Sequence, residues 1–222
     1  MIEENVKNLL ASLPQTNPYG EKITLVGAVK LQTPEAINRA VSAGLKDIGD
    51  NHVQEFKDKY AYITGDPVRH FIGHLQTNKV KYLLGKVDLY HSLDRYNLAQ
   101  ELSTRGERAG VTSNVLLQIN IGNEESKSGF GLGEADEAYK IISAMPAIKI
   151  KGLMAMLPAI GGEDELKRLA RSMREVFDRL KERDPDIVHL SMGMSGDFRL
   201  CIECGSNMIR LGTAIFGERN YG

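Results

Sequence analysis

The feature that most constrains this chain is a regular alternation of short apolar runs with longer amphipathic segments. Eight runs have the composition of strands, at residues 23–30, 46–51, 69–75, 88–93, 114–121, 148–157, 187–195 and 208–217. Between them, residues 34–44, 133–145 and 163–183 show the 3.6-residue apolar spacing of helices. Strands that alternate with helices in this way predict a parallel sheet covered by helices.

Eight such units predict an α/β fold closed into a (β/α)8 TIM barrel, in one domain spanning residues 1–222. A strand count wrong by one would favour an open, flavodoxin-like sheet instead. Residues 2–13 are amphipathic and predict an extra N-terminal helix, which caps the bottom of the barrel or packs on its flank. Hydrophobic residues make up 42% of the chain, enough to fill such a core.

Charge and hydropathy exclude several classes of partner. The formal net charge is −1, so no overall basic field draws the chain to nucleic acid or to an anionic membrane. No apolar run approaches the roughly 20 residues of a membrane span. The first residues carry acids early and do not resemble a signal peptide. Two cysteines cannot form a disulfide framework, and we therefore expect a cytoplasmic protein.

The functional face of such a barrel is at the carboxyl ends of its strands, and Lys30 is the only lysine that ends one of the eight runs. A lysine nucleophile must lose its proton, and burial among apolar groups favours that loss. The alternative is a lysine whose stem covers the strand end while its amine stays in solvent.

The last two runs end in small and hydroxyl-bearing residues, Ser195-Gly196 and Gly212-Thr213. Barrel enzymes often bind a phosphate in these two loops, where backbone N–H groups and hydroxyls converge on the oxygens. Alternatively, the glycines only permit tight turns. A lysine that faces a phosphate cradle suggests a phosphorylated carbonyl ligand, and pyridoxal 5′-phosphate has an aldehyde and a phosphate at opposite ends.

Other motifs carry weaker signals. Cys201 and Cys204 form a C-x-x-C pair without a second pair, which indicates buried thiols rather than a zinc site. His70 and His74 lie four apart in one run and could share a face, with no carboxylate to accompany them. In "GMSGD", Asp197 replaces the last glycine of the serine-hydrolase elbow, which argues against that class of enzyme.

Several longer motifs resemble one known family. They are "GDNHVQE" (49–55), "HFIGHLQTNKVK" (70–81), "HSLDR" (91–95), "INIGNEESKSGF" (119–130), "GLMAM" (152–156), "LSMGMSGDF" (190–198) and "IRLGTAIFGER" (209–219). In this order they resemble the pyridoxal-phosphate homeostasis proteins, the YggS/PROSC family, which are single-domain relatives of the alanine racemase barrel of fold-type III. The chain departs from the family's V-A-V-S-K pattern around Lys30, since Pro34 follows four residues later instead of three.

The resemblance implies roles for individual residues. Lys30 would hold the cofactor as an aldimine. Ser195, Gly196, Gly212 and Thr213 would surround the phosphate. Arg210 would face the pyridine nitrogen, and Asn51 and Met194 would border the ring.

The resemblance implies a cofactor-binding regulator or carrier without robust catalytic activity, which keeps free pyridoxal phosphate in balance. The protein partners it implies are apoenzymes that depend on pyridoxal phosphate. A charged Arg210 disfavours a protonated pyridine nitrogen, so the ring is a weak electron sink. The chain given stops at Gly222, so we expect no second domain to supply the other proton donor of a racemase, and a monomer. The alternatives are a slow amino-acid racemase and a cofactor-free Schiff-base aldolase.

Overall fold

The computed structural model describes residues 1–122, 124 and 127–217. Parts of two motifs therefore lie outside the described residues, namely positions 123, 125 and 126 of "INIGNEESKSGF" and positions 218 and 219 of "IRLGTAIFGER".

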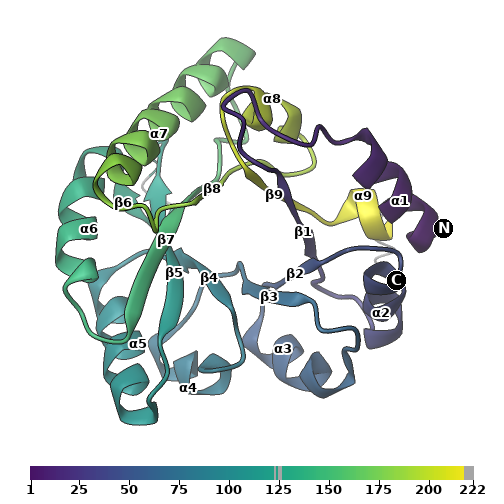
Figure 1. Ribbon diagram of the computed structural model, residues 1–222, viewed down its shortest axis with the longest axis horizontal. Helices are drawn as coiled ribbons and strands as arrows, with labels where there is room; N and C mark the ends of the chain where they lie inside the picture. The colour runs from purple at the N-terminus through teal and green to yellow at the C-terminus, as the bar shows by residue number, and fades with distance from the viewer. Residues whose placement is uncertain (123, 125–126, 218–222) are drawn as a thin grey trace.

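Parallel strands form a closed barrel with the helices outside it (Figure 1). The strands are β1 (Thr24–Ala28), β2 (Asp47–Asp50), β3 (Val68–Phe71), β4 (Leu89–Leu93), β5 (Ser113–Asn120), β6 (Phe130–Gly131), β7 (Ile148–Ala155), β8 (His189–Ser191) and β9 (Met208–Leu211). Their order is β4-β3-β2-β1-β9-β8-β7-β5, and pairing of β4 with β5 closes the ring. The short β6 pairs with the end of β5 and is not one of the eight barrel strands. The predicted (β/α)8 barrel is therefore confirmed.

The helices follow the strands and cover the barrel. They are α1 (Ile2–Ser12), α2 (Pro34–Ser42), α3 (Val53–Lys59), α4 (Val80–Leu83), α5 (Tyr96–Ala109), α6 (Ala135–Ser143), α7 (Glu163–Arg183), α8 (Phe198–Glu203) and α9 (Thr213–Phe216), with 3₁₀ turns η1 (Tyr60–Tyr62), η2 (Thr77–Lys79) and η3 (Leu132–Glu134). Within the described part of the chain, no helix is long and apolar enough to cross a bilayer.

The N-terminal helix packs on the flank of the barrel, beside α2 and α9 (Figure 1). Val6 is its fully buried residue, and the Asn5 amide donates a hydrogen bond of 3.0 Å to the carbonyl of Ile215 in α9. Of the two predicted positions for this helix, the flank is therefore the observed one.

Side chains of alternate residues fill the inside of the barrel. A cluster of Val26, Leu89, Leu116, Met154 and Met208 joins β1 and β9 to β4, β5 and β7 on another side of the ring, so these residues meet across the interior. Because side chains alternate along a strand, the residues two positions before or after each of these also point into the barrel. Larger apolar clusters lie between the strands and the helices, as a parallel sheet buried on both faces requires.

The last predicted strand is too long. Residues 208–217 were expected to form one strand, but β9 ends at Leu211 and residues 213–216 form α9. Gly212 turns the chain with helical dihedral angles, φ −117° and ψ −66°. Ile215 is apolar because it packs in the outer cluster with Leu45 and Val29, not because it continues the strand. A short apolar helix and a buried strand have the same composition.

Candidate functional site

Every barrel strand runs in the same direction, so their carboxyl ends meet at one mouth. Lys30 lies there, two residues beyond the end of β1. Val26 faces the barrel interior, and the alternation Val26, Ala28, Lys30 places Lys30 on the inward side. No hydrogen bond or ion pair of the Lys30 amine occurs among the described residues.

A buried polar group supports the turn that carries Lys30. Lys59 is 8% exposed, and its amine donates to the carbonyl of Val29 at 3.0 Å and pairs with Asp50 at 3.1 Å. Burial raises the pKa of Asp50, which the charge of Lys59 opposes. The Glu55 carboxylate accepts a hydrogen bond of 2.8 Å from the N–H of Leu31. These contacts hold the backbone on both sides of Lys30.

Leu31 has a positive φ of 62°, a conformation that few residues other than glycine adopt. The strain is held by the Leu31–Glu55 hydrogen bond and by the next turn, in which Thr33 caps α2 and Pro34 begins it. The segment between Lys30 and Pro34 is where the sequence departs from the family pattern, and the structure shows an ordered tight turn there.

Asn51 follows β2 and lies at the same mouth, on the inward side two residues after Gly49. A Cβ on Gly73 would lie 1.9 Å from the backbone oxygen of Asn51, so only glycine allows the β3 segment to pack this closely. The side-chain oxygen of Asn51 is buried without a hydrogen-bond partner among the described residues. A buried acceptor left without a donor is a position that a ligand group can satisfy.

Met194, Ser195 and Gly196 form the loop after β8. The Asp197 carboxylate accepts a hydrogen bond of 2.6 Å from the N–H of Met194, which fixes this turn at the start of α8. Asp197 is thus the residue that shapes the loop. In the described chain, the N–H groups of Ser195 and Gly196 donate to no protein acceptor. Both residues are exposed and are free to receive an anion.

Gly212 and Thr213 lie at the end of β9, next to the β1 end. A Cβ on Gly212 would lie 3.3 Å from the oxygen of Ala28 and 3.5 Å from its Cβ, so a side chain here would crowd the approach to Lys30. Thr213 is exposed and begins α9, whose first N–H groups have no partner within the helix. The N–H of Arg210 donates to the carbonyl of Gly193 at 2.9 Å, which brings the β8 and β9 loops together.

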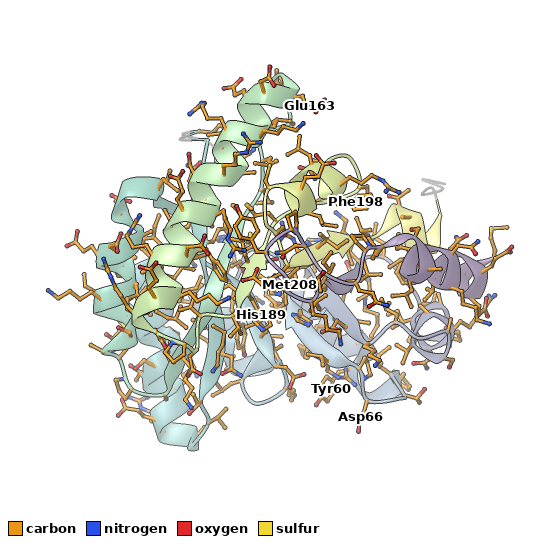
Figure 2. All side chains as sticks on the ribbon, turned by 45° about the horizontal axis from the view of Figure 1, so that its top comes forward. Tyr60, Asp66, Glu163, His189, Phe198 and Met208 are labelled. Atoms are coloured by element: carbon orange, nitrogen blue, oxygen red, sulfur yellow. The ribbon has the colours of Figure 1, made fainter. Side chains whose placement is uncertain are left out.

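Arg210 points into the barrel from β9 and is fully enclosed. Its guanidinium donates to the carbonyl of Ser191 at 3.0 Å, to the Ser191 hydroxyl at 2.5 Å and to the carbonyl of Ala155 at 3.1 Å. Burial lowers the pKa of Arg210 to about 10, so the group stays cationic at neutral pH. The labels of Met208 on β9 and His189 on β8 lie close together in Figure 2, as expected for two strands that are neighbours in the barrel.

Sequence reasoning missed the partners of the interior histidines. The sequence left open that His70 and His74 share a face, which they do not, and the expectation that no carboxylate accompanies them is wrong. His70 lies inside the barrel, 2.9 Å from His91 and 3.0 Å from Asp47. His74 lies beyond β3, is exposed, and contacts Asp94 at 3.1 Å. Strand β3 ends at Phe71, so the two histidines do not belong to one strand. The spacing of residues within one strand does not show which residues of other strands they contact.

The mouth also contains a cavity of about 230 Å³ lined by Ile72, His74, Gln118, Lys127, Ser128 and Met156. A larger cavity of about 510 Å³ borders Ser195 and Gly196 and extends to Glu163 of α7. Lys127 is paired with Glu124 at 2.7 Å, whereas the Lys30 amine has no such partner among the described residues.

Neither Tyr90 nor Tyr139 reaches the mouth of the barrel to act there as a proton donor. Tyr90 belongs to the apolar layer outside the barrel, where burial raises its pKa. Tyr139 is on α6 and donates a hydrogen bond of 2.9 Å to Asp184. Cys201 and Cys204 are buried free thiols, as predicted, and burial raises the pKa of both.

Comparison with known proteins identifies the family. A family model described as "Alanine racemase, N-terminal domain" matches residues 2–220. The pyridoxal phosphate homeostasis protein of Aquifex aeolicus is 44% identical over 199 residues, which cover 89% of this chain and 87% of that protein. This chain belongs to the pyridoxal phosphate homeostasis protein family. The Escherichia coli K12 member is 41% identical and covers 90% of this chain, which covers 88% of it.

Solved structures agree with this family and fold. PipY of Synechococcus elongatus, in a structure with PLP bound, has a TM-score of 0.84 at 29% identity. That match covers 98% of this chain and 100% of the other. An alanine racemase of Corynebacterium glutamicum has a TM-score of 0.76 at 15% identity, and the chain spans 61% of it. The second likeness shows the shared barrel alone.

Proposed function

We propose that this chain binds pyridoxal 5′-phosphate at the mouth of its barrel and acts in the balance of that cofactor. The observation that carries the proposal is the meeting, on one rim, of the Lys30 amine with two loops rich in N–H groups; neither the amine nor the N–H groups of Ser195 and Gly196 have a partner among the described residues. Membership of a family whose relatives carry the name of pyridoxal phosphate homeostasis protein supports it, as does the PLP-bound structure of PipY.

The residues present fit this cofactor. Its aldehyde would condense with the Lys30 amine to an aldimine. Its phosphate carries two negative charges, which suit the N–H groups of Ser195 and Gly196 and the start of α9 at Gly212-Thr213. The orphan oxygen of Asn51 offers an acceptor to a polar substituent of the ring, and Met194, 39% exposed, offers an apolar edge.

Arg210 limits the chemistry that the bound cofactor could support. A pyridine nitrogen that faces a guanidinium is poorly protonated, because two positive charges would then meet in a buried place. Tyr90 and Tyr139 lie outside the mouth, so neither supplies a second acid or base. Both features favour a holder of the cofactor over a racemase. We propose further that the protein is a cytoplasmic monomer that passes the cofactor to dependent apoenzymes.

A Lys30→Ala variant tests the assignment. We expect wild-type protein mixed with pyridoxal phosphate to acquire a visible band that borohydride removes by fixing the cofactor to the chain. Lys30→Ala should lose this covalent capture. Lys127→Ala, which removes another amine at the mouth, should keep it. Capture that persists in Lys30→Ala, or fails in the wild type, would contradict the proposal.

Solvent deuterium separates the carrier from the racemase. A carrier leaves the α-hydrogen of added amino acids in place, whereas a racemase exchanges it in a Lys30-dependent way. Sedimentation of the purified protein at several concentrations tests the monomer.

A further inference from the structure

A continuous row of hydrogen-bonded side chains crosses the inside of the barrel from Arg210 to Asp47. The Arg210 guanidinium contacts the Ser191 hydroxyl at 2.5 Å, and this hydroxyl lies 3.2 Å from Nδ1 of His91. Nε2 of His91 lies 2.9 Å from Nδ1 of His70, and Nε2 of His70 lies 3.0 Å from the Asp47 carboxylate. Four strands contribute to the row besides β4, namely β2, β3, β8 and β9.

The row begins with a hydrogen-bond donor, Arg210, and ends with an acceptor, Asp47. These two groups fix the direction in which the hydrogen bonds between them run. A guanidinium only donates and a carboxylate only accepts. With Arg210 donating to Ser191, the serine proton is free to go to His91, so Nδ1 of His91 accepts and its Nε2 carries the proton. That Nε2–H donates to Nδ1 of His70, and the Nε2–H of His70 donates to Asp47. Every member is then satisfied with both histidines neutral.

The surroundings favour a neutral ring at His91. His91 is completely buried, and burial, His70 and Arg210 all lower its pKa well below the ordinary value. His189 on β8 faces the same space, and burial with His70 lowers its pKa to about 4. Lys151 on β7 adds a positive charge near His189, and the opposing negative charge is Asp47. The Asp47 carboxylate at one end and the Arg210 guanidinium at the other therefore favour a single arrangement of hydrogen bonds, in which the side chains between them carry no charge.

We propose that Asp47 is a positioning residue for Arg210. By accepting from His70 it orients both imidazoles, and this keeps the lone pairs of the Ser191 oxygen turned to the guanidinium. Asp47 lies at the start of β2, at the amino end of the barrel, while the cofactor site lies at the carboxyl end. The effect on a bound ring rests on the proposed function, whereas the direction of the row belongs to the protein alone.

Nitrogen-15 NMR of the histidines tests the direction without cofactor. We expect His91 to be the neutral Nε2–H tautomer, with the proton of His70 that faces Asp47 also on Nε2. In Asp47→Asn the amide can donate as well as accept, so the Nδ1–H tautomer of His91 should become detectable. Asp186→Asn is the matched control, because Asp186 is at the same end of the barrel and pairs with Lys151 at 3.1 Å instead. Mixed tautomers in the wild type, or an unchanged His91 in Asp47→Asn, would overturn the proposed direction.

The loaded protein tests the consequence for the ring. In Asp47→Asn we expect the pH midpoint of the visible band of bound cofactor to move by half a unit or more (about a threefold change in the proton equilibrium), with no move in Asp186→Asn. If the wild type binds no cofactor while the tautomers are as expected, the proposed function fails and the row stands. If the cofactor binds, but Asp47→Asn leaves the midpoint in place, Asp47 has only a structural role. An Asp47→Glu variant that restores the midpoint would show that the carboxylate itself is responsible.

Discussion

The two ends of the barrel differ in whether their polar groups have hydrogen-bond partners within the protein. At the amino end, Glu21 accepts hydrogen bonds from Arg174 at 2.6 Å, Lys181 at 2.6 Å, Asn17 at 3.0 Å and Asn207 at 3.2 Å. At the carboxyl end, the Asn51 oxygen is buried without a partner in the described chain, and the N–H groups of Ser195 and Gly196 are open. The Glu21 cluster is thus satisfied within the protein, although the Ser113 hydroxyl at the start of β5 is buried without a partner in the described chain, whereas the groups at the carboxyl end are left open.

This difference separates stability from binding. Groups satisfied within the protein lower the free energy of the folded chain and have nothing left to offer a ligand. Buried groups without a partner raise that free energy and remain available to bind a ligand. In a (β/α)8 barrel the amino face is the usual place for stability and the carboxyl face for function. Variants at the two ends should therefore affect unfolding and cofactor binding in opposite proportions.

Arg174→Met should have the largest effect on stability. Arg174 is 5% exposed, holds Glu21, donates to the carbonyl of Gly205 at 3.0 Å and stacks 3.8 Å from the ring centre of Tyr19. Removing one partner of such a buried pair costs about 3–5 kcal/mol. Urea unfolding measures it, and Arg171→Met on the exposed face of α7 should stay within about 0.5 kcal/mol of the wild type. Cofactor affinity should be unchanged; a loss of affinity in folded Arg174→Met would break the separation of the two ends.

Two asparagines allow a matched test of both ends. The Asn207 side chain accepts from the N–H of Leu190 at 2.7 Å and donates to the carbonyl of Val188 at 2.8 Å. Asn207→Leu leaves these groups unsatisfied and should cost about 2–4 kcal/mol of unfolding free energy. Asn51→Leu removes an acceptor that has no partner in the described structure, and should stabilise the empty protein by about 1 kcal/mol.

Cofactor affinity should respond in the reverse order. Asn51→Leu should bind pyridoxal phosphate about tenfold more weakly, the equivalent of one hydrogen bond to the ring. Asn207→Leu should bind normally where it is folded. Equal destabilisation by the two substitutions would contradict the difference between the ends.

The pH dependence of stability should also reflect the amino end. Burial raises the pKa of Glu21, but hydrogen bonds from Arg174, Lys181 and Asn17 outweigh it and lower the pKa from 4.5 to about 2. A carboxylate whose pKa is lowered by folding contributes stability above its unfolded value and loses it as the pH falls through the folded one. The free energy of unfolding should therefore fall between pH 4.5 and about 2, and Glu21→Gln should flatten this slope. An equally steep slope in Glu21→Gln would assign the loss to other carboxylates.

The carboxyl end was more accessible to sequence reasoning than the interior. Lys30, Asn51, Gly196 and Thr213 follow strands, and parallel strands share an end, so their common location follows from the order of elements alone. Their roles toward a cofactor remain predictions. The helix at residues 163–183 was predicted to its last residue because its apolar spacing is regular and its acids and bases follow the helix dipole.

What could not be predicted depends on pairing across the barrel. His70 and His91 are 21 residues apart and meet only because β3 and β4 are neighbours. The Lys59–Asp50 pair joins a helix to the strand before it, and no sequence period marks it. The turn at Leu31 is set by Glu55 from a later helix, so local propensity gave no sign of its positive φ. Residues 212–217 looked like a strand since composition does not distinguish a buried strand from one buried turn of helix.

The hydroxyls of the two loops should produce the smallest effects. Ser195→Ala and Thr213→Val each remove one donor toward the phosphate but leave the N–H groups in place, so each should weaken cofactor binding about fivefold, roughly 1 kcal/mol. Both side chains are exposed, and the unfolding free energy should change by less than about 0.5 kcal/mol. Equilibrium titration of the visible band measures the affinity, with Ser143→Ala on α6 as the control for loss of an exposed hydroxyl. The double variant should show additive losses if both hydroxyls bind the same phosphate independently. If neither single variant nor the double one changes affinity, the backbone of the two loops binds the phosphate without them, and the contrast between the ends concerns N–H groups alone.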